Sequence, residues 1–244
     1  MSLIFHHPEF EQEVRERLSI FEREITEEDA LLVNELDLTN FNFKEDDIET
    51  LFLFPNLTSL SIITGEYDSS FWNHFNKLQD LFWECWGHKI DFSVFSNMKN
   101  LTSLMVSGGD CSGIEFIGLD SLIKLTHLDE LILHEFGPVD LTPLENMPQL
   151  KHFSLSYTDS AQNIETIGKL RWLESLTLHG LYIDNLDFLD SLPGFIELDM
   201  CGIEIYGRKN VDILKWKRFE KRDICEIKVK NQHWEYIDLS VLED

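Results

Sequence analysis

One segment of the sequence has the residue spacing of a catalytic nucleophile. Residues 109–113 read Gly-Asp-Cys-Ser-Gly, which places Cys111 in the pattern glycine-x-nucleophile-x-glycine. Such a pattern forms a nucleophile elbow where a strand leads directly into a long helix of an α/β sheet. In this sequence the segment follows a short predicted strand, residues 101–106, which is one of eight repeated strands described below. The distance to the next repeated strand is the longest of the series, which favours a glycine-rich inserted loop. We therefore predict that the chain is not an enzyme and assign no catalytic residue.

The histidines and carboxylates do not form a recognisable metal or acid–base site. His134 and His179 are predicted to lie two strands apart, about 10 Å, whereas zinc–nitrogen bonds are about 2 Å long. His6 and His7 have no accompanying ligand spacing, and no phosphate-binding glycine loop is present. The 45 acidic residues could supply general acid–base pairs, but the sequence singles out no pair. We predict no metal and no cofactor.

Composition and charge exclude several classes of function. The chain has 244 residues, of which 43% are apolar, and 45 acidic against 20 basic residues give a net charge of −25. The apolar content is too high for a disordered chain. Binding to nucleic acid or to an anionic membrane surface depends on Lys and Arg, so this charge argues against both partners. A strongly acidic protein is instead expected to attract a basic one.

Cysteine use and the first residues of the chain predict a cytoplasmic protein. The four cysteines are far apart in the sequence and show no paired spacing, which is typical of thiols that stay reduced. They are Cys85, Cys111, Cys201 and Cys225. No apolar run approaches the roughly 20 residues that span a bilayer, and the start of the chain lacks the pattern of a secretory leader. We expect a cytoplasmic location and no disulfide.

The charge is unevenly distributed along the chain. Residues 1–50 hold 15 acidic and 4 basic residues, and residues 101–200 hold 16 and 4. Residues 201–244 hold nine of each, with a basic cluster over residues 208–222. This shift in composition predicts a boundary near residue 202. The basic cluster either belongs to a cap or forms a second site for a partner.

A short apolar phrase recurs along most of the chain. Eight segments read apolar-x-x-apolar-x-apolar, and their middle apolar residues are 21 to 27 residues apart, within the window of about 20–29 for leucine-rich repeats. Between these phrases apolar residues recur at every third position, which predicts one or two turns of tight helix. One such unit cannot bury its apolar rows alone, so the units must stack into a solenoid. The phrases are VNELDL (33–38), LTSLSI (57–62), LQDLFW (78–83), LTSLMV (101–106), LDELIL (128–133), LKHFSL (150–155), LESLTL (173–178) and FIELDM (195–200).

These repeats resemble those of bacterial leucine-rich repeat proteins of the short, internalin-like type. The resemblance covers roughly residues 5–203 and is clearest in DLTPLENMPQLKHFSLS and IDNLDFLDSLPGFIELDM. It implies an α/β solenoid, an arc of about eight repeats with a parallel concave sheet that binds another macromolecule. We expect a helical N-terminal cap over residues 1–32, repeats over 33–202 and a C-terminal capping segment over 203–244. The ninth repeat position lacks the asparagine common in the family, so the turns must be held by other groups.

Both ends of the chain are expected to close the solenoid. Thr26 precedes an acidic turn that would cap a second short helix. Apolar residues with helical spacing predict a longer helix before it: Phe10, Val14, Leu18 and Phe21. The alternating sequence DICEIKVKNQHWEYIDL predicts a closing strand or hairpin, with inward positions at Ile224, Ile227 and Val229.

The concave face is predicted to carry an apolar centre. Alternate residues of a strand point to opposite faces, so the third, fifth and seventh repeat positions line the concave side. Three successive strands place Phe82, Met105 and Ile132 at the fifth position. An apolar centre inside a charged rim is the anatomy of a protein-binding patch. Alternatively, the centre is incidental to the sheet, or the end segments or a second copy cover it. The rim consists of Asp80, Glu84, Glu130, His134 and His152.

The sequence therefore predicts a non-enzymatic module that binds a basic protein through its acidic concave face, as an adaptor or an inhibitor. An immunity or antitoxin protein that neutralises a basic toxin or nuclease is a narrower alternative, because acidic horseshoe proteins can cover anion-binding active sites. An effector that acts inside a host is a further alternative. The oligomeric state stays open.

Overall fold

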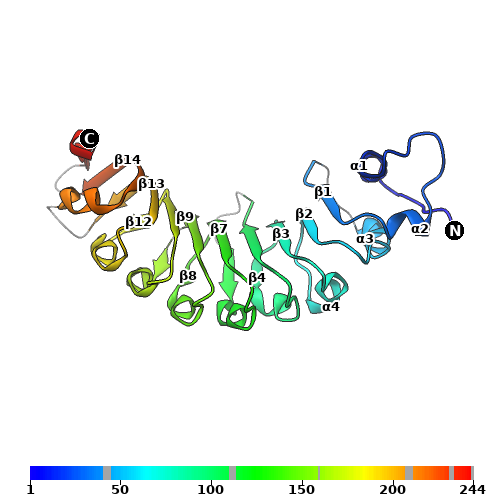
Figure 1. Ribbon diagram of the computed structural model, residues 1–244, viewed down its shortest axis with the longest axis horizontal. Coiled ribbons are helices and arrows are strands. Elements are labelled where there is room, and N and C mark those ends of the chain that lie inside the picture. Colours follow the sequence, from blue (N-terminus) through cyan, green and yellow to red (C-terminus); the bar gives the residue numbers. More distant parts are fainter. Residues whose placement is uncertain (41–44, 110–113, 159, 207–210, 231–233, 243–244) are drawn as a thin grey trace.

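The repeated apolar phrases form parallel strands along the inner side of an arc, and the segments between them return along its outer side (Figure 1). The structure is a computed structural model that describes residues 1–40, 45–109, 114–158, 160–206, 211–230 and 234–242. Cys111 of the glycine-rich segment 109–113, predicted to be an inserted loop, lies outside the described residues. The N-terminal and C-terminal ends lie at opposite ends of the arc (Figure 1).

The main sheet follows the order of the sequence. The middle apolar residues of the eight phrases lie opposite one another on neighbouring strands, from Leu36 opposite Leu60 to Leu176 opposite Leu198. This arrangement confirms the predicted leucine-rich repeat solenoid with a parallel concave sheet. The parallel strands are β1 (Glu35–Leu38), β2 (Ser59–Thr64), β3 (Asp80–Cys85), β5 (Ser103–Ser107), β7 (Glu130–Phe136), β9 (His152–Thr158), β11 (Ser175–His179), β13 (Glu197–Ile205) and β14 (Lys221–Lys230), and β15 (Trp234–Tyr236) pairs antiparallel with β14.

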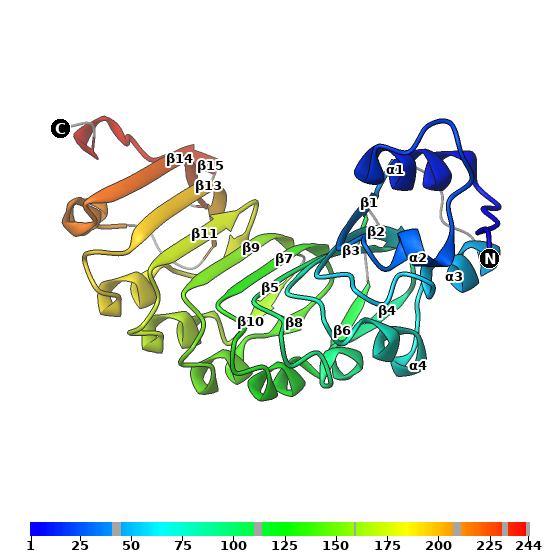
Figure 2. The same ribbon diagram turned by 45° about the vertical axis from the view of Figure 1, so that its right-hand side comes forward.

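The return segments are short helical turns, as the three-residue apolar period predicts. Figure 2 shows them stacked along the outer side of the sheet. The turns are α3 (Glu45–Leu51), α4 (Ser69–Trp72), η1 (Asn73–Phe75), η2 (Phe92–Phe95), η3 (Leu119–Lys124), η4 (Thr142–Asn146), η5 (Ile164–Lys169), η6 (Asp187–Ser191) and η7 (Ile213–Arg218). Short strands join them to the main sheet: β4 (Lys89–Asp91), β6 (Glu115–Ile117), β8 (Val139–Asp140), β10 (Ala161–Gln162) and β12 (Tyr182–Ile183). A further turn, η8 (Ser240–Leu242), follows β15.

One continuous apolar core runs between the sheet and the outer turns. The template positions of the eight phrases are buried, with the exception of Phe195, which is exposed while the adjacent Ile196 is buried. At this copy the chain turns through Pro193, whose carbonyl accepts a hydrogen bond from the Ile196 amide at 3.3 Å. Ile196 therefore takes the inward position that was predicted for Phe195. Each buried Leu or Ile side chain contributes about 1.5–3 kcal/mol, which is what holds the repeats together.

Backbone and hydroxyl groups hold the turns where the asparagine is missing. The Thr158 hydroxyl donates a hydrogen bond to the Gly137 carbonyl at 2.9 Å. Near the start of the arc, the Trp83 indole Nε1 donates to the Thr64 hydroxyl at 2.9 Å. Each of these bonds joins neighbouring repeats, so it supplies the link that an asparagine ladder would make.

The N-terminal cap contains the two predicted helices, α1 (Pro8–Leu18) and α2 (Glu27–Ala30). Phe10 and Val14 are fully buried on the core side of α1. The helix ends at Leu18, because Ser19 adopts a left-handed conformation with φ of 55°. Phe21 lies beyond this end and is exposed, so its predicted place in the helical row is wrong.

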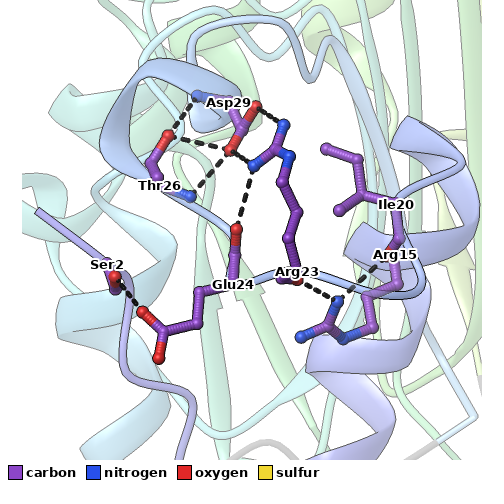
Figure 3. A network of polar contacts seen from close by, with 7 residues as sticks. All are labelled: Ser2, Arg15, Ile20, Arg23, Glu24, Thr26 and Asp29. Atoms are coloured by element: carbon purple, nitrogen blue, oxygen red, sulfur yellow. Dashed lines mark hydrogen bonds and ion pairs between the residues drawn. The ribbon is translucent and has the colours of Figure 1, made fainter.

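A polar network around Asp29 fixes the second helix (Figure 3). The Thr26 amide donates to Asp29 Oδ2 at 2.8 Å, and the Asp29 amide donates to Thr26 Oγ1 at 3.3 Å, which together form a capping box. The Arg23 guanidinium donates to both carboxylate oxygens at 2.7 Å. The hydrogen bond from Arg23 first, and then those from Thr26, hold the pKa of Asp29 well below its usual range.

The C-terminal segment extends the sheet by the predicted hairpin. Strand β14 pairs in parallel with β13, and Ile227 and Val229 are buried while Ile224 is half-buried. Arg222 lies opposite Leu198, at the position that is apolar in every earlier repeat. Its guanidinium donates to the carbonyls of Phe219 at 2.9 Å and Leu242 at 2.6 Å. Strand β14 therefore uses polar groups, at the position where the earlier repeats have an apolar residue, to hold Phe219 and Leu242 to the solenoid.

The expectation that no disulfide forms is wrong. Cys201 and Cys225 lie opposite one another on β13 and β14 and are joined by a disulfide, with their Cα atoms 4.7 Å apart. They are 24 residues apart in the sequence, which is one repeat. Stacking of the repeats thus brings together two cysteines whose spacing looks unpaired along the chain. Cys85 is fully buried in the core and is not part of this disulfide.

Candidate functional site

The predicted apolar centre lies at the middle of the concave sheet. Phe82 of β3 is opposite Met105 of β5, and Met105 is opposite Ile132 of β7. All three side chains are half-buried. The next residues in this row are polar on both sides, Ser61 on β2 and Ser154 on β9. The register therefore confines the apolar stripe to three neighbouring strands, a span of about 10 Å.

Acidic groups line the edge of this stripe where the strands begin. Asp80, Ser103, Glu130 and His152 are opposite one another on successive strands. The Ser103 hydroxyl donates to Glu130 Oε2 at 2.5 Å, which fixes that carboxylate beside the stripe. Partial burial of its carboxyl, together with the nearby charges of Glu130 and Asp129, raises the pKa of Asp80. This edge presents concentrated negative charge.

The opposite edge combines charged and aromatic groups. Glu84 accepts a hydrogen bond from the Trp86 indole Nε1 at 2.5 Å. The His134 ring lies edge-on to Tyr157, with ring centroids 5.3 Å apart, and its Nδ1 is 3.6 Å from the Glu135 carboxylate. The five predicted rim residues therefore occupy the two edges of the stripe, with His134 and His152 on opposite edges.

Two residues predicted to line the open face are buried instead. Ser107 and Ser156, both at the seventh repeat position, are 2% and 4% exposed. Ser107 lies between Glu84 and His134 in the sheet, and Ser156 lies between His134 and His179. The longer side chains on either side cover these short ones. At the seventh repeat position, therefore, only the longer residues between the serines are accessible to a partner.

The described histidines of the concave face lie apart from one another. The His179 Nε2 lies 2.8 Å from an Asp199 carboxylate oxygen on the next strand, while His152 lies at the opposite edge of its own strand. Among the described residues, no group of three or more His, Cys, Asp and Glu side chains could hold a metal ion. Over the same residues, no helix combines the length and apolar character needed to cross a bilayer.

Sequence reasoning missed the aromatic side chains that border the concave face. Trp86 directly follows β3, Tyr157 lies near the end of β9 and Tyr182 lies in β12; they are 62%, 56% and 54% exposed. The columns assigned to the concave face stop at the seventh repeat position, so these residues fell outside them. Large aromatic side chains exposed beside a binding face are enriched among residues that contribute most to protein binding.

Comparison with known proteins identifies the fold. No protein-family model matches the chain, and no curated protein matches its sequence. Internalin C2 of Listeria monocytogenes is similar in structure with a TM-score of 0.66 at 16% identity, over 92% of this chain and 94% of that protein. Internalin InlF of the same organism gives 0.60 at 18% identity, over 93% and 72%.

A plant protein shares the same architecture. The Arabidopsis receptor kinase HAESA, solved in complex with the peptide hormone IDA and the co-receptor SERK1, gives a TM-score of 0.58 at 18% identity, over 81% of this chain and 35% of that one. At such identities these likenesses show the fold alone. They confirm the leucine-rich repeat solenoid and the resemblance to internalin-like repeats.

Proposed function

We propose that this chain is a non-enzymatic module that binds a basic protein through the concave face of its sheet. The observation that carries the proposal is the register of Phe82, Met105 and Ile132, which places three half-exposed apolar side chains side by side. Protein–protein interfaces commonly have an apolar core that the partner desolvates, surrounded by a rim of polar groups, and this stripe with its polar edges has the same arrangement. The receptor kinase HAESA supports this reading, since a protein with this fold is solved with a peptide hormone.

The charge of the chain supports a basic partner. The net charge of −25 produces a field that accelerates encounter with cationic proteins and repels anionic ones. Part of this charge lies where the partner would contact the concave face. It is carried by Asp80 and Glu130 at one edge of the stripe and by Glu84 at the other. In this proposal the field guides the partner, and the apolar stripe supplies most of the contact energy.

Within this function we propose inhibition or neutralisation of a basic protein as the more specific role. An acidic arc that covers the anion-binding site of a basic toxin or nuclease would act as an immunity or antitoxin protein. An adaptor role and an effector role use the same surface and differ only in the partner. The identity of the captured protein decides among these roles.

The decisive experiment is affinity capture with the full chain from the lysate of its native host, at low and then at high salt. We expect a basic protein whose retention falls with ionic strength, because exposed charges are screened over about 10 Å at 0.1 M salt. The captured protein is then expressed and its dissociation constant for the chain is measured. If the bound protein is acidic, or if its retention is unaffected by salt, the proposed charge complementarity is wrong.

Two substitutions test the surface itself. Phe82→Glu and Ile132→Glu place a charge in the apolar stripe and should weaken binding of the captured protein by at least tenfold. Both positions are half-exposed, so the fold should tolerate the change, which circular dichroism will verify. Phe195→Glu is the matched control, since Phe195 is an exposed aromatic residue that precedes β13 outside the stripe. Unchanged binding by both folded stripe variants would exclude this surface.

The redox state of Cys201 and Cys225 tests in which cellular compartment the protein acts. A cytoplasmic location, as expected from the sequence, requires the protein to act with Cys201 and Cys225 reduced. A disulfide between them instead suits an oxidising compartment. Mass spectrometry of the protein isolated from its host after rapid thiol alkylation distinguishes the two locations.

A further inference from the structure

A row of left-handed residues crosses the C-terminal half of the sheet, within its strands or directly after them. Glu135, Tyr157, Gly180, Gly202 and Glu226 each come directly after the seventh repeat position and have φ between 49° and 67°. Four of them lie within β7, β9, β13 and β14, and Gly180 directly follows β11. Figure 2 shows that these five strands lie side by side in the sheet. Residues with the same backbone conformation at the same repeat position project their side chains in similar directions.

Two glycines interrupt this row and leave a slot. Gly180 and Gly202 carry no side chain, so the Tyr157 ring can lie over the first glycine while the space above the second stays open toward Glu226. The Tyr157 ring leans over Gly180, where an added Cβ would lie 2.4 Å from a ring carbon. At Gly202 an added Cβ would approach no atom closer than 3.5 Å, so the space above it is free.

The slot has walls of defined chemistry. Its volume is about 360 Å³, and its lining combines two tyrosine rings, the glycine backbone and one carboxylate. Tyr157 and Tyr182 form the aromatic sides, and both are more than half exposed. Cys201, held to Cys225 by the disulfide, lies on the floor beside Gly202. The disulfide joins the two strands that carry Gly202 and Glu226 and therefore fixes the spacing between these walls.

The charged wall of the slot is exposed to solvent. Glu226 is an exposed residue of β14, and its carboxylate interacts electrostatically with Lys228, two residues further along the strand. Lys228, the nearest cation along the strand, is paired with Glu204 at 3.6 Å. Its Nζ also lies 5.0 Å from the Tyr236 ring. The same end of the sheet carries a second cation over an aromatic ring, Lys230 over Trp234 at 4.6 Å.

We propose that this slot binds one arginine side chain of a protein partner. The planar guanidinium would stack on the Tyr157 ring and donate paired hydrogen bonds to the Glu226 carboxylate. Arginine fits better than lysine, because its flat group is weakly hydrated and matches both an aromatic face and a carboxylate. The glycine floor lets the side chain approach the backbone closely. That the arginine belongs to a protein partner rests on the proposed function, whereas the ability of the slot to bind an arginine side chain does not.

The test uses small probes and the full chain in its oxidised form. N-acetylarginine amide is titrated into the ¹⁵N-labelled protein, and the amide shifts of Gly180, Gly202 and Glu226 are followed by NMR. N-acetylcitrulline amide has nearly the same shape without the charge and serves as the matched probe. We expect saturable shifts at these amides with arginine and at least fivefold weaker binding of citrulline. Shifts spread evenly over the acidic surface, or equal binding of the two probes, would overturn the proposal.

Two variants localise the site. Glu226→Gln removes the charge from an exposed position and should weaken arginine binding at least fivefold. Gly202→Asn fills the slot with a residue that tolerates the left-handed conformation and should abolish the shifts. Glu165→Gln, on the outer turn η5, removes the same charge elsewhere and should leave binding unchanged. Arginine binding that survives Glu226→Gln in a folded protein refutes the site even if Gly202→Asn fails to fold.

The outcomes separate this inference from the proposed function. If the captured partner depends on Phe82 and Ile132 but binds equally well to Glu226→Gln, the slot is not its anchor and the concave stripe stands. If the arginine probe binds in the slot while both stripe variants retain the partner, the slot stands and the stripe is excluded. If a partner arginine occupies the slot, replacing that arginine by glutamine should weaken binding of the partner to the parent chain. The same replacement should not weaken its binding to the Glu226→Gln variant.

Discussion

The disulfide between Cys201 and Cys225 should account for a large part of the stability at the C-terminal end. The bond closes a loop with a sequence separation of 24 residues. Because cross-linking removes conformations of the unfolded chain, a loop of this length is worth about 3.5 kcal/mol in the loop-entropy model. Each repeat of a solenoid contacts only its neighbours, so the loss on reduction should concentrate in β13, β14 and the segments that follow them.

The assay compares the parent chain with Cys201→Ser/Cys225→Ser by urea unfolding, each with and without reductant. Cys201 is half-buried and Cys225 is exposed, so the serines bury no new polar group. With an m value of about 2–3 kcal/mol/M, the midpoint should fall by about 1–2 M urea. Reductant should lower the midpoint of the parent chain to that of the variant and leave the variant unchanged, which makes the variant the control for other effects of the reagent.

Two further measurements bear on the same prediction. The denatured parent chain should show two fewer reactive thiols before reduction than after it. Amide hydrogen exchange should become faster in β14 on reduction and stay unchanged in β1, at the other end of the arc. Equal midpoints for the oxidised and reduced parent chain, or an equal thiol count before and after reduction, would refute this account of the C-terminal end.

Three other predictions concern the cap, the core and the slot. Asp29 has a lowered pKa because of Arg23, so it stabilises the folded chain above the unfolded pKa of about 3.9. This contribution is lost as the pH falls toward the folded value. Asp29→Asn should therefore reduce stability at pH 7 but flatten its decline below pH 5, as measured by urea unfolding at each pH. Leu131→Ala, at a fully buried position of the central strand, should cost about 2–5 kcal/mol in unfolding free energy. Gly180→Ala should cost about 1–2 kcal/mol for its left-handed backbone and displace the Tyr157 ring, which a change in near-ultraviolet circular dichroism will report.

The architecture and the apolar centre are predictable because both depend on a periodic pattern. Leucines at fixed positions every 21 to 27 residues allow one arrangement in which every apolar row is buried, and that arrangement sets the register of the strands. Aligning the repeats with one another therefore suffices to place Phe82, Met105 and Ile132 in one row. The strands of the folded protein pair in this register.

The C-terminal end breaks the pattern and could not be aligned in the same way. Arg222 stands where the other repeats have an apolar residue, so β14 was not recognised as a further strand of the parallel sheet. Without that register, Cys201 and Cys225 look unrelated, although their strands bring them together. The exposed Phe21 was misplaced for a similar reason, because helical spacing alone does not show that the chain turns away at Ser19.

The sequence by itself determined the repeat, the curved parallel sheet, the negative charge and the position of the apolar stripe, since each follows from residue type and period. Only the tertiary structure decided the disulfide and the slot between Tyr157 and Glu226. These features depend on left-handed residues in or next to the strands and on which side chains meet across neighbouring strands. Such contacts join residues one or more repeats apart, and they form only when the stacked core brings the strand ends together.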